Sequence, residues 1–568
     1  MSEAQARYQA WLNDEAVDAA TKQELQLLEG SEREIEDRFY RDLEFGTGGL
    51  RGVIGAGTNR MNRYTVAKAT QGLARFVLEQ PLAAGESLHS VAIAYDSRNQ
   101  SPEFSLEAAL VLAGNGIRAY LFDALRTTPE LSFAVRHLRA TAGIVVTASH
   151  NPPEYNGYKV YGADGGQLVP ASAERVLAHV QAVAGNADVL RLTAEEAVAQ
   201  GLLVTVGAAV DEAYIDAVTS VSLNADVVRA VSDEFSIVYT PLHGAGNLSV
   251  RAALARIGFR HVHVVPEQEL PDAGFSTVRS PNPEEREAFT LAIELAKQEH
   301  ADLIIGTDPD CDRVGAVVKN SAGEYVVLTG NQSGALLTHY LLSSLKAKGQ
   351  LPPNGVVIKT IVTSEMGAVI AQAYGVSTLN TLTGFKYIGA KMTEFEQTGE
   401  KRFLFGYEES YGYLAGTYAR DKDAVLASML LCEAAAYYKS QGQTLYEVLE
   451  ELYRTYGTFL EALESRTMKG IDGVAAIRGI MADWRNHPPE MVGGVPVAAV
   501  QDYSLGIDDL PQENVLKFTL ADDSWFCLRP SGTEPKIKVY FSVCGGTPDQ
   551  ASEQLNRLRT AVMERVDG

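Results

Sequence analysis

The sequence predicts an α/β protein, with three related α/β domains followed by a smaller C-terminal α+β domain. Three observations lead to this prediction. The chain has 568 residues, which is too many for a single hydrophobic core. Short β-branched apolar runs alternate with helical segments, and this alternation begins three times along the chain. From about residue 497 it is replaced by closely spaced strand-like runs and one final helix.

The first α/β unit follows about 45 residues that are expected to be helical. In that helical region, residues 31–34 form a capping-box pattern that would open one helix. Strands of the first unit are expected at residues 91–95, 118–122 and 144–146. A helix is expected after each of the first two strands, because Ser101-Pro102 and Thr128-Pro129 are typical helix starts.

The second and third units repeat this order, and the tail departs from it. The second unit has expected strands at residues 236–239, 262–265 and 303–305. The third begins with a strand at 356–361 and a helix after Ser364, with a further helical segment near 424–439. The tail is expected to contain strands at 515–520, 525–528 and 537–543, then a helix from Pro548. We predict domains at residues 1–205, 206–328, 329–470 and 471–568.

Charge and composition limit the classes of function. The net charge of −23 argues against general binding to nucleic acid or to an anionic membrane, because both need a basic face. The N-terminus lacks the apolar core of a secretory signal, and no transmembrane helix is expected. The four cysteines have no paired CxxC spacing, which favours reduced thiols in a cytoplasmic protein over a zinc site. They are Cys311, Cys432, Cys527 and Cys544.

A serine directly follows one of the predicted strands. The apolar run at 144–146 stops at Thr147, and Ser149 and His150 come next in a small polar loop. In open α/β sheets, ligands bind beyond the carboxyl ends of the strands, so Ser149 is a candidate carrier of a phosphoryl group. A turn in which the serine bonds its own backbone is the alternative.

Three carboxylates at alternate positions follow the strand predicted at 303–305. They are Asp308, Asp310 and Asp312, and Arg313 comes next. Hard divalent cations prefer clustered oxygen ligands, and Mg²⁺ also accepts a substrate phosphate. The spacing excludes an EF-hand, whose sixth position would be Arg313 rather than glycine. An acidic turn is the other alternative, but crowded carboxylates repel one another unless a cation or Arg313 offsets them.

Three further segments carry polar side chains between glycines. The turn at 45–52 holds four glycines and Arg51, which could meet an anion. Lys386 lies between glycines at 383–389 and could bind phosphate or move a proton. Glu408 and Ser410 lie on a glycine-flanked loop and suit sugar hydroxyls. An exposed turn is the alternative for the last two segments, and the charged run at 420–423 is expected to be a solvated ion-pair cluster.

The last polar segment, residues 529–538, lies between two expected strands. It contains Arg529, two hydroxyl residues, a glycine and two lysines. Free backbone N–H groups around a glycine, together with an arginine, form a nest for an anion. A plain hairpin loop would more often use Asn-Gly and would not need the arginine, so phosphate binding is favoured here.

Four of these loops resemble the signature loops of the α-D-phosphohexomutases, in the same order. They are residues 147–152, 307–313, 406–410 and 529–535. Residues 45–52 and 383–389 are similar to the bacterial α-phosphoglucomutase branch of that superfamily. The resemblance covers nearly the whole chain. It implies a four-domain, heart-shaped molecule with its active site in a central cleft and a mobile fourth domain.

The resemblance also implies an activity and a role for each loop. It implies interconversion of glucose 1-phosphate and glucose 6-phosphate through a phosphoserine and a glucose 1,6-bisphosphate intermediate. Ser149 would be the phosphoserine beside His150. One Mg²⁺ would be held by Asp308, Asp310 and Asp312, with an oxygen of phosphorylated Ser149 completing the site. The substrate would be bound by Thr47, Arg51, Glu408, Ser410, Arg529, Ser531, Gly532, Thr533 and Lys538.

The proton-transfer group is the point where the sequence departs from some relatives. The loop at 406–410, which would bind the sugar hydroxyls, is called the sugar-reading loop. Certain phosphomannomutases have a histidine just after it, whereas Tyr411-Gly412-Tyr413 follows it in this sequence. The acid–base role therefore falls to Lys386 or Lys159. Arg313 would supply positive charge at the phosphate on Ser149.

Several alternatives stay open at this point. Phosphopentomutase, phosphomannomutase and glucose 1,6-bisphosphate synthase activities share the same loops. A phosphatase with Asp308 as nucleophile is a rival, although that class usually has Thr or Val where Asp312 stands. A sugar-phosphate-binding regulator without turnover is a third reading. The expected partners are small sugar phosphates, and the protein is expected to be a monomer or a homodimer.

Overall fold

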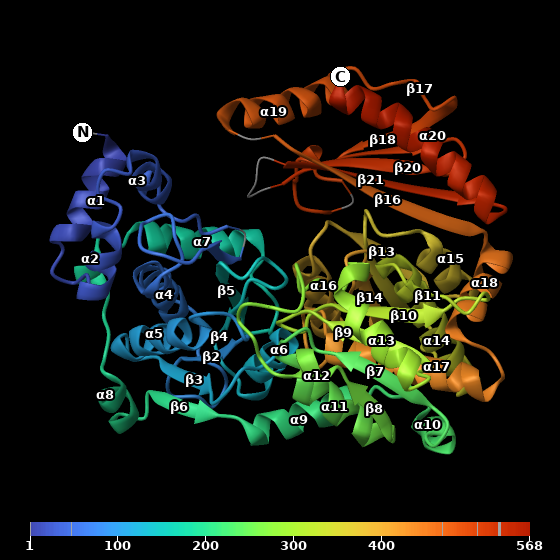
Figure 1. The fold of residues 1–568 in the computed structure, drawn as a ribbon, viewed down its shortest axis with the longest axis horizontal. Helices are drawn as coiled ribbons and strands as arrows, with labels where there is room; N and C mark the ends of the chain where they lie inside the picture. Colours follow the sequence, from blue (N-terminus) through green and yellow to red (C-terminus); the bar gives the residue numbers. More distant parts are fainter. Residues whose placement is uncertain (1, 47, 469, 508, 532–535) are drawn as a thin grey trace.

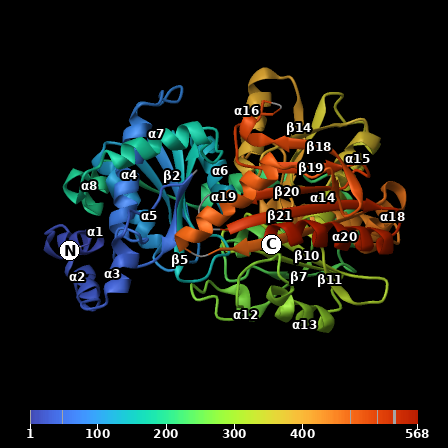
Figure 2. The ribbon, with the colours of Figure 1, turned by 90° about the horizontal axis from the view of Figure 1, so that it is seen from above.

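The computed structural model describes residues 2–46, 48–468, 470–507, 509–531 and 536–568. Four β-sheets follow one another along the chain (Figure 1). The first lies on one side of the molecule, the second and third lie together on the other, and the fourth is stacked on the third (Figures 1 and 2). The expected architecture of three α/β domains and a fourth α+β domain is confirmed.

The first domain begins with three helices that pack on one another through an apolar cluster containing Tyr8, Leu25 and Phe39. These helices are α1 (Glu3–Asn13), α2 (Ala19–Gln26) and α3 (Glu32–Phe39). The sheet has the order β1-β5-β4-β2-β3-β6. Its strands are β1 (Gly49–Val53), β2 (Ser90–Tyr95), β3 (Arg118–Phe122), β4 (Ala142–Val146), β5 (Tyr155–Gly162) and β6 (Leu203–Val206). Its helices are α4 (Arg63–Leu78), α5 (Ser101–Gly114), α6 (Thr128–His137), α7 (Pro170–Gln181) and α8 (Ala194–Ala199), with a short η1 (Asn186–Asp188).

The second domain has a five-stranded sheet in the order β11-β10-β9-β7-β8. Its strands are β7 (Ser236–Thr240), β8 (His261–Val264), β9 (Leu303–Thr307), β10 (Val314–Lys319) and β11 (Tyr325–Val327). Its helices are α9 (Ala208–Thr219), α10 (Ala225–Val231), α11 (Gly246–Ile257), α12 (Pro266–Glu269), η2 (Arg286–Phe289) and α13 (Thr290–Gln298).

The third domain has a four-stranded sheet in the order β13-β12-β14-β15. Its strands are β12 (Gly355–Thr360), β13 (Ser377–Thr381), β14 (Arg402–Glu408) and β15 (Gly412–Ala415). Its helices are α14 (Gly330–Ala347), α15 (Met366–Ala373), α16 (Phe385–Thr398), α17 (Ala424–Ser440) and α18 (Leu445–Tyr456). Apolar side chains of all three α/β domains meet in one large buried cluster, so these domains share a core.

The first three sheets share one topology. Each has three neighbouring parallel strands, and a fourth strand pairs antiparallel with the last of them. The equivalent sets are β3-β2-β4-β5, β8-β7-β9-β10 and β13-β12-β14-β15. The predicted relationship between the three α/β units therefore extends to the order and direction of their strands.

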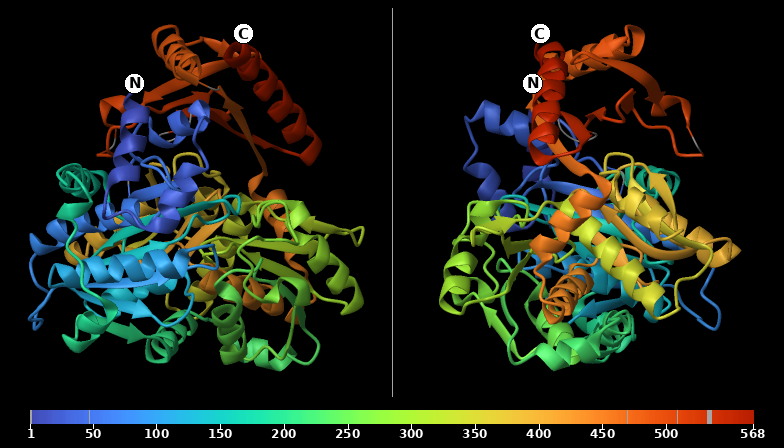
Figure 3. Two further views of the ribbon diagram at one scale, coloured as in Figure 1. Left: turned by 60° about the vertical axis from the view of Figure 1, so that its left-hand side comes forward. Right: turned by 90° about the vertical axis from the view of Figure 1, so that its right-hand side faces the viewer.

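The fourth domain is an antiparallel sheet in the order β16-β21-β20-β19-β18-β17, covered on one face by two helices (Figure 3). Its strands are β16 (Thr458–Thr467), β17 (Met491–Val492), β18 (Val495–Asp502), β19 (Leu516–Leu520), β20 (Trp525–Pro530) and β21 (Lys536–Gly545). Its helices are α19 (Gly470–Asn486), η3 (Tyr503–Leu505) and α20 (Pro548–Asp567). β16, which precedes the domain boundary predicted at residue 470, pairs along its whole length with β21.

Two predicted helix starts differ in detail. Ser31 precedes α3, but its side chain makes no capping hydrogen bond. The cap position of α5 is Gln100 rather than Ser101, while Pro102 lies in the first turn as expected. All four cysteines are free thiols. Within the described part of the chain, no helix combines the length and apolarity that crossing a membrane requires.

Candidate functional site

The predicted functional loops occupy the same place in each of the first three sheets. In each sheet the chain leaves a parallel strand, makes a short loop and returns antiparallel. These loops follow β4, β9 and β14, at the carboxyl ends where open α/β sheets bind ligands. The first loop carries Ser149, the second carries the three aspartates and the third carries Ser410. Glu408 is the last residue of β14, just before the third loop.

Ser149 lies in the β4–β5 loop and is only 5% exposed. Its Oγ donates a hydrogen bond to Asp308 Oδ2 at 2.6 Å and lies 3.2 Å from His150 Nδ1. Its backbone is left-handed, with φ of 52°, a conformation that is uncommon for a residue other than glycine. The candidate nucleophile of the first domain therefore contacts the aspartate loop of the second.

A buried pair, Asp96 and Arg98, holds the serine loop in place, and the sequence analysis missed both residues. Thr147 Oγ1 accepts from Ser149 N at 2.9 Å and donates to Asp96 Oδ2 at 2.7 Å. Arg98 Nε lies 3.4 Å from the same Asp96 oxygen. The Arg98 guanidinium also donates to four carbonyls of the loop, those of Ser149, Asn151, Pro152 and Tyr155. The available signal was the Asp-Ser-Arg triplet at residues 96–98, directly after β2.

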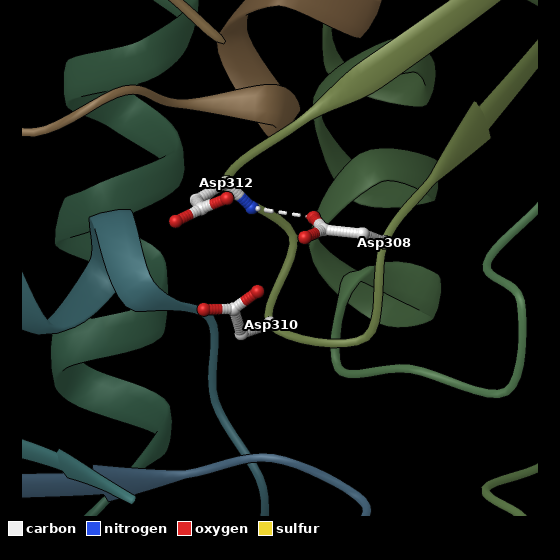
Figure 4. Close-up of side chains that lie close together, drawn as sticks. All are labelled: Asp308, Asp310 and Asp312. Atoms are coloured by element: carbon white, nitrogen blue, oxygen red, sulfur yellow. Dashed lines mark hydrogen bonds between the residues drawn. The ribbon is translucent and has the colours of Figure 1, made fainter. Parts of the chain in front are cut away.

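The three aspartates of the β9–β10 loop point toward one another (Figure 4). One carboxylate oxygen of each lies within 4.8 Å of the others, and all three residues are buried. Asp308 Oδ1 accepts from the backbone N–H of Asp312 at 3.1 Å and of Arg313 at 2.9 Å. Asp310 Oδ1 and Asp312 Oδ1 are buried without a hydrogen-bond partner among the described residues. Buried oxygens without partners, in a cluster of this size, suit a divalent cation.

The charge state of the three carboxylates follows from their neighbours. Burial and the two other aspartates raise the pKa of Asp308 well above its usual range. Burial acts to raise the pKa of Asp312 too, but Lys422, Lys159 and Arg313 outweigh it and hold this pKa below its usual range. A divalent cation among the three carboxylates would favour the ionised form of Asp308.

Two lysines from different domains close around the aspartates. Lys159 of β5 places Nζ 2.8 Å from Asp310 Oδ2 and 3.3 Å from Asp312 Oδ2. Lys422 of the third domain places Nζ 2.8 Å from Asp312 Oδ2. The three domains therefore meet at this one group of charges.

Lys422 belongs to the run 420–423, and the prediction that this run is solvated is wrong. Arg420 and Asp423 are fully buried and Asp421 is 3% exposed. Asp421 accepts from Tyr161 OH of the first domain at 2.8 Å, and Asp423 accepts from Tyr214 OH of the second at 2.9 Å. The run is thus a buried junction between domains, and its carboxylates accept hydrogen bonds from side chains of the first and second domains.

His150 lies beside Ser149, and Arg313 lies beside Asp312. His150 Nδ1 lies 4.0 Å from Asp308 Oδ2, and burial together with Arg313 lowers the pKa of this histidine to about 3. Arg313 donates to Glu284 Oε1 at 2.7 Å and lies 3.7 Å from Asp312 Oδ1. Burial acts to lower the pKa of Arg313, but Glu284 and the aspartates outweigh it and raise this pKa. His150 is therefore neutral at physiological pH and Arg313 is charged.

Arg51 lies near this centre, as do Glu408 and Ser410, the two residues predicted to bind sugar hydroxyls. Arg51 of β1 donates to Asn151 Oδ1 of the serine loop at 3.5 Å. Glu408 accepts from the backbone N–H of Gly384 at 3.0 Å, which joins two of the predicted segments. Burial raises the pKa of Glu408 to about 7, with Glu409 adding to the rise against the opposing effect of Lys422. Ser410 is half-buried in the loop that follows.

The predicted anion clamp lies on the fourth domain. Arg529 of β20 faces Lys538 of β21 across the sheet, and Nε of Arg529 lies 3.9 Å from Glu513. The Ser531 N–H donates to the Lys536 carbonyl at 2.7 Å, which joins the end of β20 to the start of β21. Burial and Arg529 lower the pKa of Lys538, whereas Tyr540, Glu513 and Glu409 outweigh burial and raise the pKa of Arg529.

Not all predicted residues are brought to the aspartate centre. Lys386, at the start of α16, has Nζ 5.1 Å from the centre of the Tyr387 ring and lies on the side of Glu513 and Arg529. Burial lowers the pKa of this lysine. It therefore lies beside the clamp, whereas Lys159 lies at the aspartates. The predicted binding residues Thr47, Gly532 and Thr533 lie outside the described residues.

The repeated topology, with one polar loop at the same edge of each of three sheets, is that of the phosphohexomutases, which are enzymes of the mutase class. More particularly, the chain belongs to the phosphoglucomutase/phosphomannomutase family. Alpha/beta/alpha domains I, II and III of that family match residues 42–186, 212–323 and 329–456. The C-terminal domain of the family matches residues 464–561.

Relatives and solved structures agree with this assignment. A phosphoglucomutase of Staphylococcus haemolyticus is 38% identical over 531 residues, which cover 92% of this chain and 94% of the relative. A phosphoglucomutase of Staphylococcus aureus is 36% identical over 547 residues, covering 93% and 94%. The open form of a Paramecium phosphoglucomutase has a TM-score of 0.71 at 17% identity, covering 93% of this chain and 95% of that one. A family protein of Burkholderia thailandensis has a TM-score of 0.66 at 17% identity, covering 92% and 96%. These two structural likenesses show the shared fold.

Proposed function

We propose that this chain is a phosphoglucomutase that interconverts glucose 1-phosphate and glucose 6-phosphate. The observation that carries the proposal is the contact of Ser149 Oγ with Asp308 at 2.6 Å, inside a family fold whose Staphylococcus relatives bear this name. A serine hydroxyl beside a buried aspartate cluster supports a phosphoserine that gives and takes a phosphoryl group.

The proposed reaction has two transfers. In the first, the bond between Ser149 Oγ and phosphorus breaks, and a bond forms between phosphorus and the free hydroxyl of the sugar monophosphate. The hydroxyl proton passes to a basic group of the protein. The product is glucose 1,6-bisphosphate, which then reorients within the site so that its other phosphate faces Ser149. In the second transfer, the bond between the other phosphorus and its sugar oxygen breaks, and a bond forms between that phosphorus and Ser149 Oγ. The sugar oxygen takes up a proton from the protein, and the second monophosphate leaves.

We propose that Asp308, Asp310 and Asp312 hold one Mg²⁺, with an oxygen of phosphorylated Ser149 as a further ligand. One oxygen each of Asp310 and Asp312 is buried without a hydrogen-bond partner in the part of the chain that the structure describes, which supports this assignment. When bound, the cation supplies positive charge against the negative charge that spreads over a transferring phosphoryl group. Arg313 and Lys422 add fixed positive charge around the same aspartates.

The remaining residues bind and orient the sugar phosphate. We propose that Glu408 and Ser410 accept and donate hydrogen bonds at the sugar hydroxyls. Arg51 and Thr47 would bind from the first domain. Arg529, Ser531, Gly532, Thr533 and Lys538 would clamp the phosphate that is not reacting. Because the clamp and the serine are on separate domains, a bisphosphate can present either end to Ser149.

The proton of the sugar hydroxyl needs an acceptor, and three lysines are candidates. Lys159 and Lys422 contact the aspartates, and their negative neighbours outweigh burial and raise the pKa of each amine, so both hold a proton firmly. Such a group can donate a proton to a leaving oxygen. Burial lowers the pKa of Lys386, which favours proton acceptance, but this lysine lies beside the clamp rather than at Ser149.

The proposal is tested by a substrate panel with purified protein, Mg²⁺ and a trace of glucose 1,6-bisphosphate. We expect the highest kcat/KM with glucose 1-phosphate, compared with mannose 1-phosphate and ribose 1-phosphate. A preference for mannose or pentose phosphate would replace the proposal with phosphomannomutase or phosphopentomutase activity. Net accumulation of the bisphosphate would indicate a synthase, and no turnover of any sugar phosphate would favour a regulator.

Two expectations from the sequence complete the proposal. We propose a cytoplasmic location, and a monomeric or homodimeric state. Fractionation of cells tests the location, and light scattering of the purified protein tests the oligomeric state.

A further inference from the structure

Lys517 lies in the contact between the fourth and third domains, and no step of the proposed reaction uses it. It is on β19 and is 7% exposed. Its Nζ donates to the carbonyl of Ile361 at 2.7 Å and lies 3.6 Å from Glu365 Oε1, both in the third domain. The same Nζ lies 4.2 Å from the centre of the Trp525 ring. Burying a charge is costly without partners, so this lysine strongly favours the position in which all three contacts form.

The covalent connection between the two domains is a single stretch of chain. α18 ends at Tyr456, Gly457 has φ of 97°, and β16 begins at Thr458. One such connection leaves a domain free to turn, and Lys517 supplies a second fixed point. In the sheet, β21 and β20 lie between β16 and β19, and the register places Lys517 level with Leu463, five residues along β16 from Thr458. The two points are therefore about 22 Å apart. Two points at this spacing restrict the orientation of the sheet.

The register of the fourth sheet places Lys517 on the same face as the clamp. Lys517 is opposite Cys527, and Arg529 is opposite Lys538. Residues two positions apart on a strand share a face, so all four side chains are on one face. The other face packs into the core of the domain with Phe518 and Phe526. A tilt of the sheet at Lys517 therefore moves Arg529 directly.

On the side of the third domain, the same contact leads to the sugar-reading loop. Glu365 also accepts from Nζ of the fully buried Lys359, at 3.0 Å. The next residue, Thr360, donates through Oγ1 to Glu409 Oε2 at 3.2 Å, and Thr363 Oγ1 donates to the same oxygen at 3.1 Å. Glu409 is the direct neighbour of Glu408 and Ser410. The contact point of the fourth domain is thus linked by hydrogen bonds to the loop proposed to bind the sugar.

We propose that Lys517 is a positioning residue that seats the fourth domain on segment 361–365 and so sets the spacing between the phosphate clamp and the sugar-reading loop. The kinetic part of this inference rests on the proposed function, whereas its structural part does not. Without the ammonium group, the domain would spend less time in the position that can bind substrate. The apparent affinity for the sugar phosphate falls in proportion to the fraction of molecules in that position, while kcat is retained.

The test uses Lys517→Met, which keeps the apolar stem and removes the charge. Lys439→Met is a matched control, because Lys439 Nζ also bonds a carbonyl, of Glu234 at 2.6 Å, and a carboxylate, of Asp302 at 2.7 Å, between the third and second domains. We expect Lys517→Met to raise KM for glucose 1-phosphate by about tenfold or more, with kcat within about threefold. Lys439→Met should leave KM within about twofold. Partial misfolding would instead lower kcat at unchanged KM.

Hydrogen exchange of the ligand-free protein supplies a readout that needs no activity. We expect the amides of the β14–β15 hairpin to exchange faster in Lys517→Met than in the natural protein, and Lys439→Met to leave them unchanged. Wild-type KM together with wild-type exchange in Lys517→Met would overturn the inference while the proposed function stands. If the natural protein turns over no sugar phosphate, the proposed function fails and the exchange result alone decides the role of Lys517.

A second variant covers the case in which Lys517→Met does not fold. Glu365→Gln keeps the shape of the side chain and removes the negative charge that lies beside both Lys359 and Lys517. It should raise KM in the same direction by a smaller factor and speed exchange in the same hairpin. If Glu365→Gln changes neither quantity, Lys517 does not position the clamp.

Discussion

At the scale of single residues, the position of Ser149 depends on groups behind its loop. A left-handed backbone at a residue other than glycine costs about 1–3 kcal/mol, and it persists only where the surroundings enforce it. Arg98 supplies much of that enforcement, because one guanidinium binds four carbonyls of the loop. The hydroxyl is then held 2.6 Å from Asp308 of the second domain. Preorganisation of this kind is most of what a protein contributes to phosphoryl transfer.

Replacing Arg98 tests this dependence. Arg98→Lys keeps the charge but loses the planar fork of donors, so fewer of the four carbonyls are bound. We expect kcat with glucose 1-phosphate to fall about ten- to hundredfold with KM little changed, because small displacements of a reacting atom are costly. Arg63→Lys, at a half-exposed ion pair with Glu107, is the control and should keep wild-type kcat. An unaltered kcat in Arg98→Lys would contradict the account of the loop.

Glu408 should make activity depend on pH near neutrality. Its pKa is raised to about 7, so the carboxylate that we propose accepts bonds from sugar hydroxyls is lost as pH falls through 7 rather than through 4.5. We expect log kcat/KM to fall with decreasing pH below 7, and Glu408→Gln to be less active but to lack this component. The substrate phosphate titrates equally in both proteins, so the difference between the two profiles isolates Glu408. Parallel profiles would show that Glu408 does not titrate in this range.

The residues that the sequence predicted differ in kind from those it missed. Ser149 and the aspartates stand next to a strand end within a recognisable local pattern, so short windows of sequence identify them. Asp96, Arg98 and Lys422 act through contacts with segments far away along the chain. Lys422 stands in a run of alternating charges, which by composition indicates solvent exposure, and only the folded chain brings Asp312 to it.

At the scale of elements, one hairpin pattern is used three times. A loop between a parallel strand and an antiparallel return is held at both ends by strand pairing, so its side chains are fixed more firmly than those of a free loop. The sequence predicted the strands before two of these loops, because β4 and β9 are apolar and β-branched, but it did not predict β14. It did not predict the return strand β5, whose Tyr-Asn-Gly-Tyr-Lys sequence resembles a turn. That segment is a strand because it pairs with β1 on one side and β4 on the other.

The β9–β10 loop should require a divalent cation. We expect chelation with EDTA to abolish turnover and added Mg²⁺ to restore it. Asp310→Asn removes one anionic oxygen and should raise the Mg²⁺ concentration needed for half-maximal activity by about tenfold or more. Isothermal titration of Mg²⁺ into the natural and variant proteins measures the same loss without turnover. Full activity after thorough chelation would rule out the metal role of this loop.

At the scale of the whole molecule, the three α/β domains and the fourth domain are joined differently. The first three share one large buried core and several interdomain hydrogen bonds around residues 420–423. The fourth rests on the third through a small apolar cluster containing Ile361, Tyr387 and Trp525, and through the polar contacts of Lys517. The sequence predicted four domains from the repeated strand–helix order. It could not predict which interfaces are extensive, because that depends on side chains brought together from several domains.

The clamp should act from this loosely joined domain. Arg529→Ala removes a charge-assisted contact worth about 1.5–3 kcal/mol, which corresponds to roughly a ten- to hundredfold loss in kcat/KM for glucose 1-phosphate. KM should rise and kcat should fall, because binding energy from the distal phosphate positions the reacting hydroxyl. Arg559→Ala, an exposed residue of α20 in the same domain, is the control. An unaltered kcat/KM in Arg529→Ala would show that segment 529–538 is an ordinary strand connection.

The central claim is that Ser149 carries the phosphoryl group. The most direct measurement is peptide mass spectrometry of the protein after incubation with glucose 1,6-bisphosphate and Mg²⁺, followed by a chase with unlabelled glucose 1-phosphate. The account predicts one phosphate on Ser149, its transfer to sugar during the chase, and no phosphate and no turnover in Ser149→Ala. A hydroxylamine-sensitive phosphate on Asp308, or full turnover by Ser149→Ala, would contradict it.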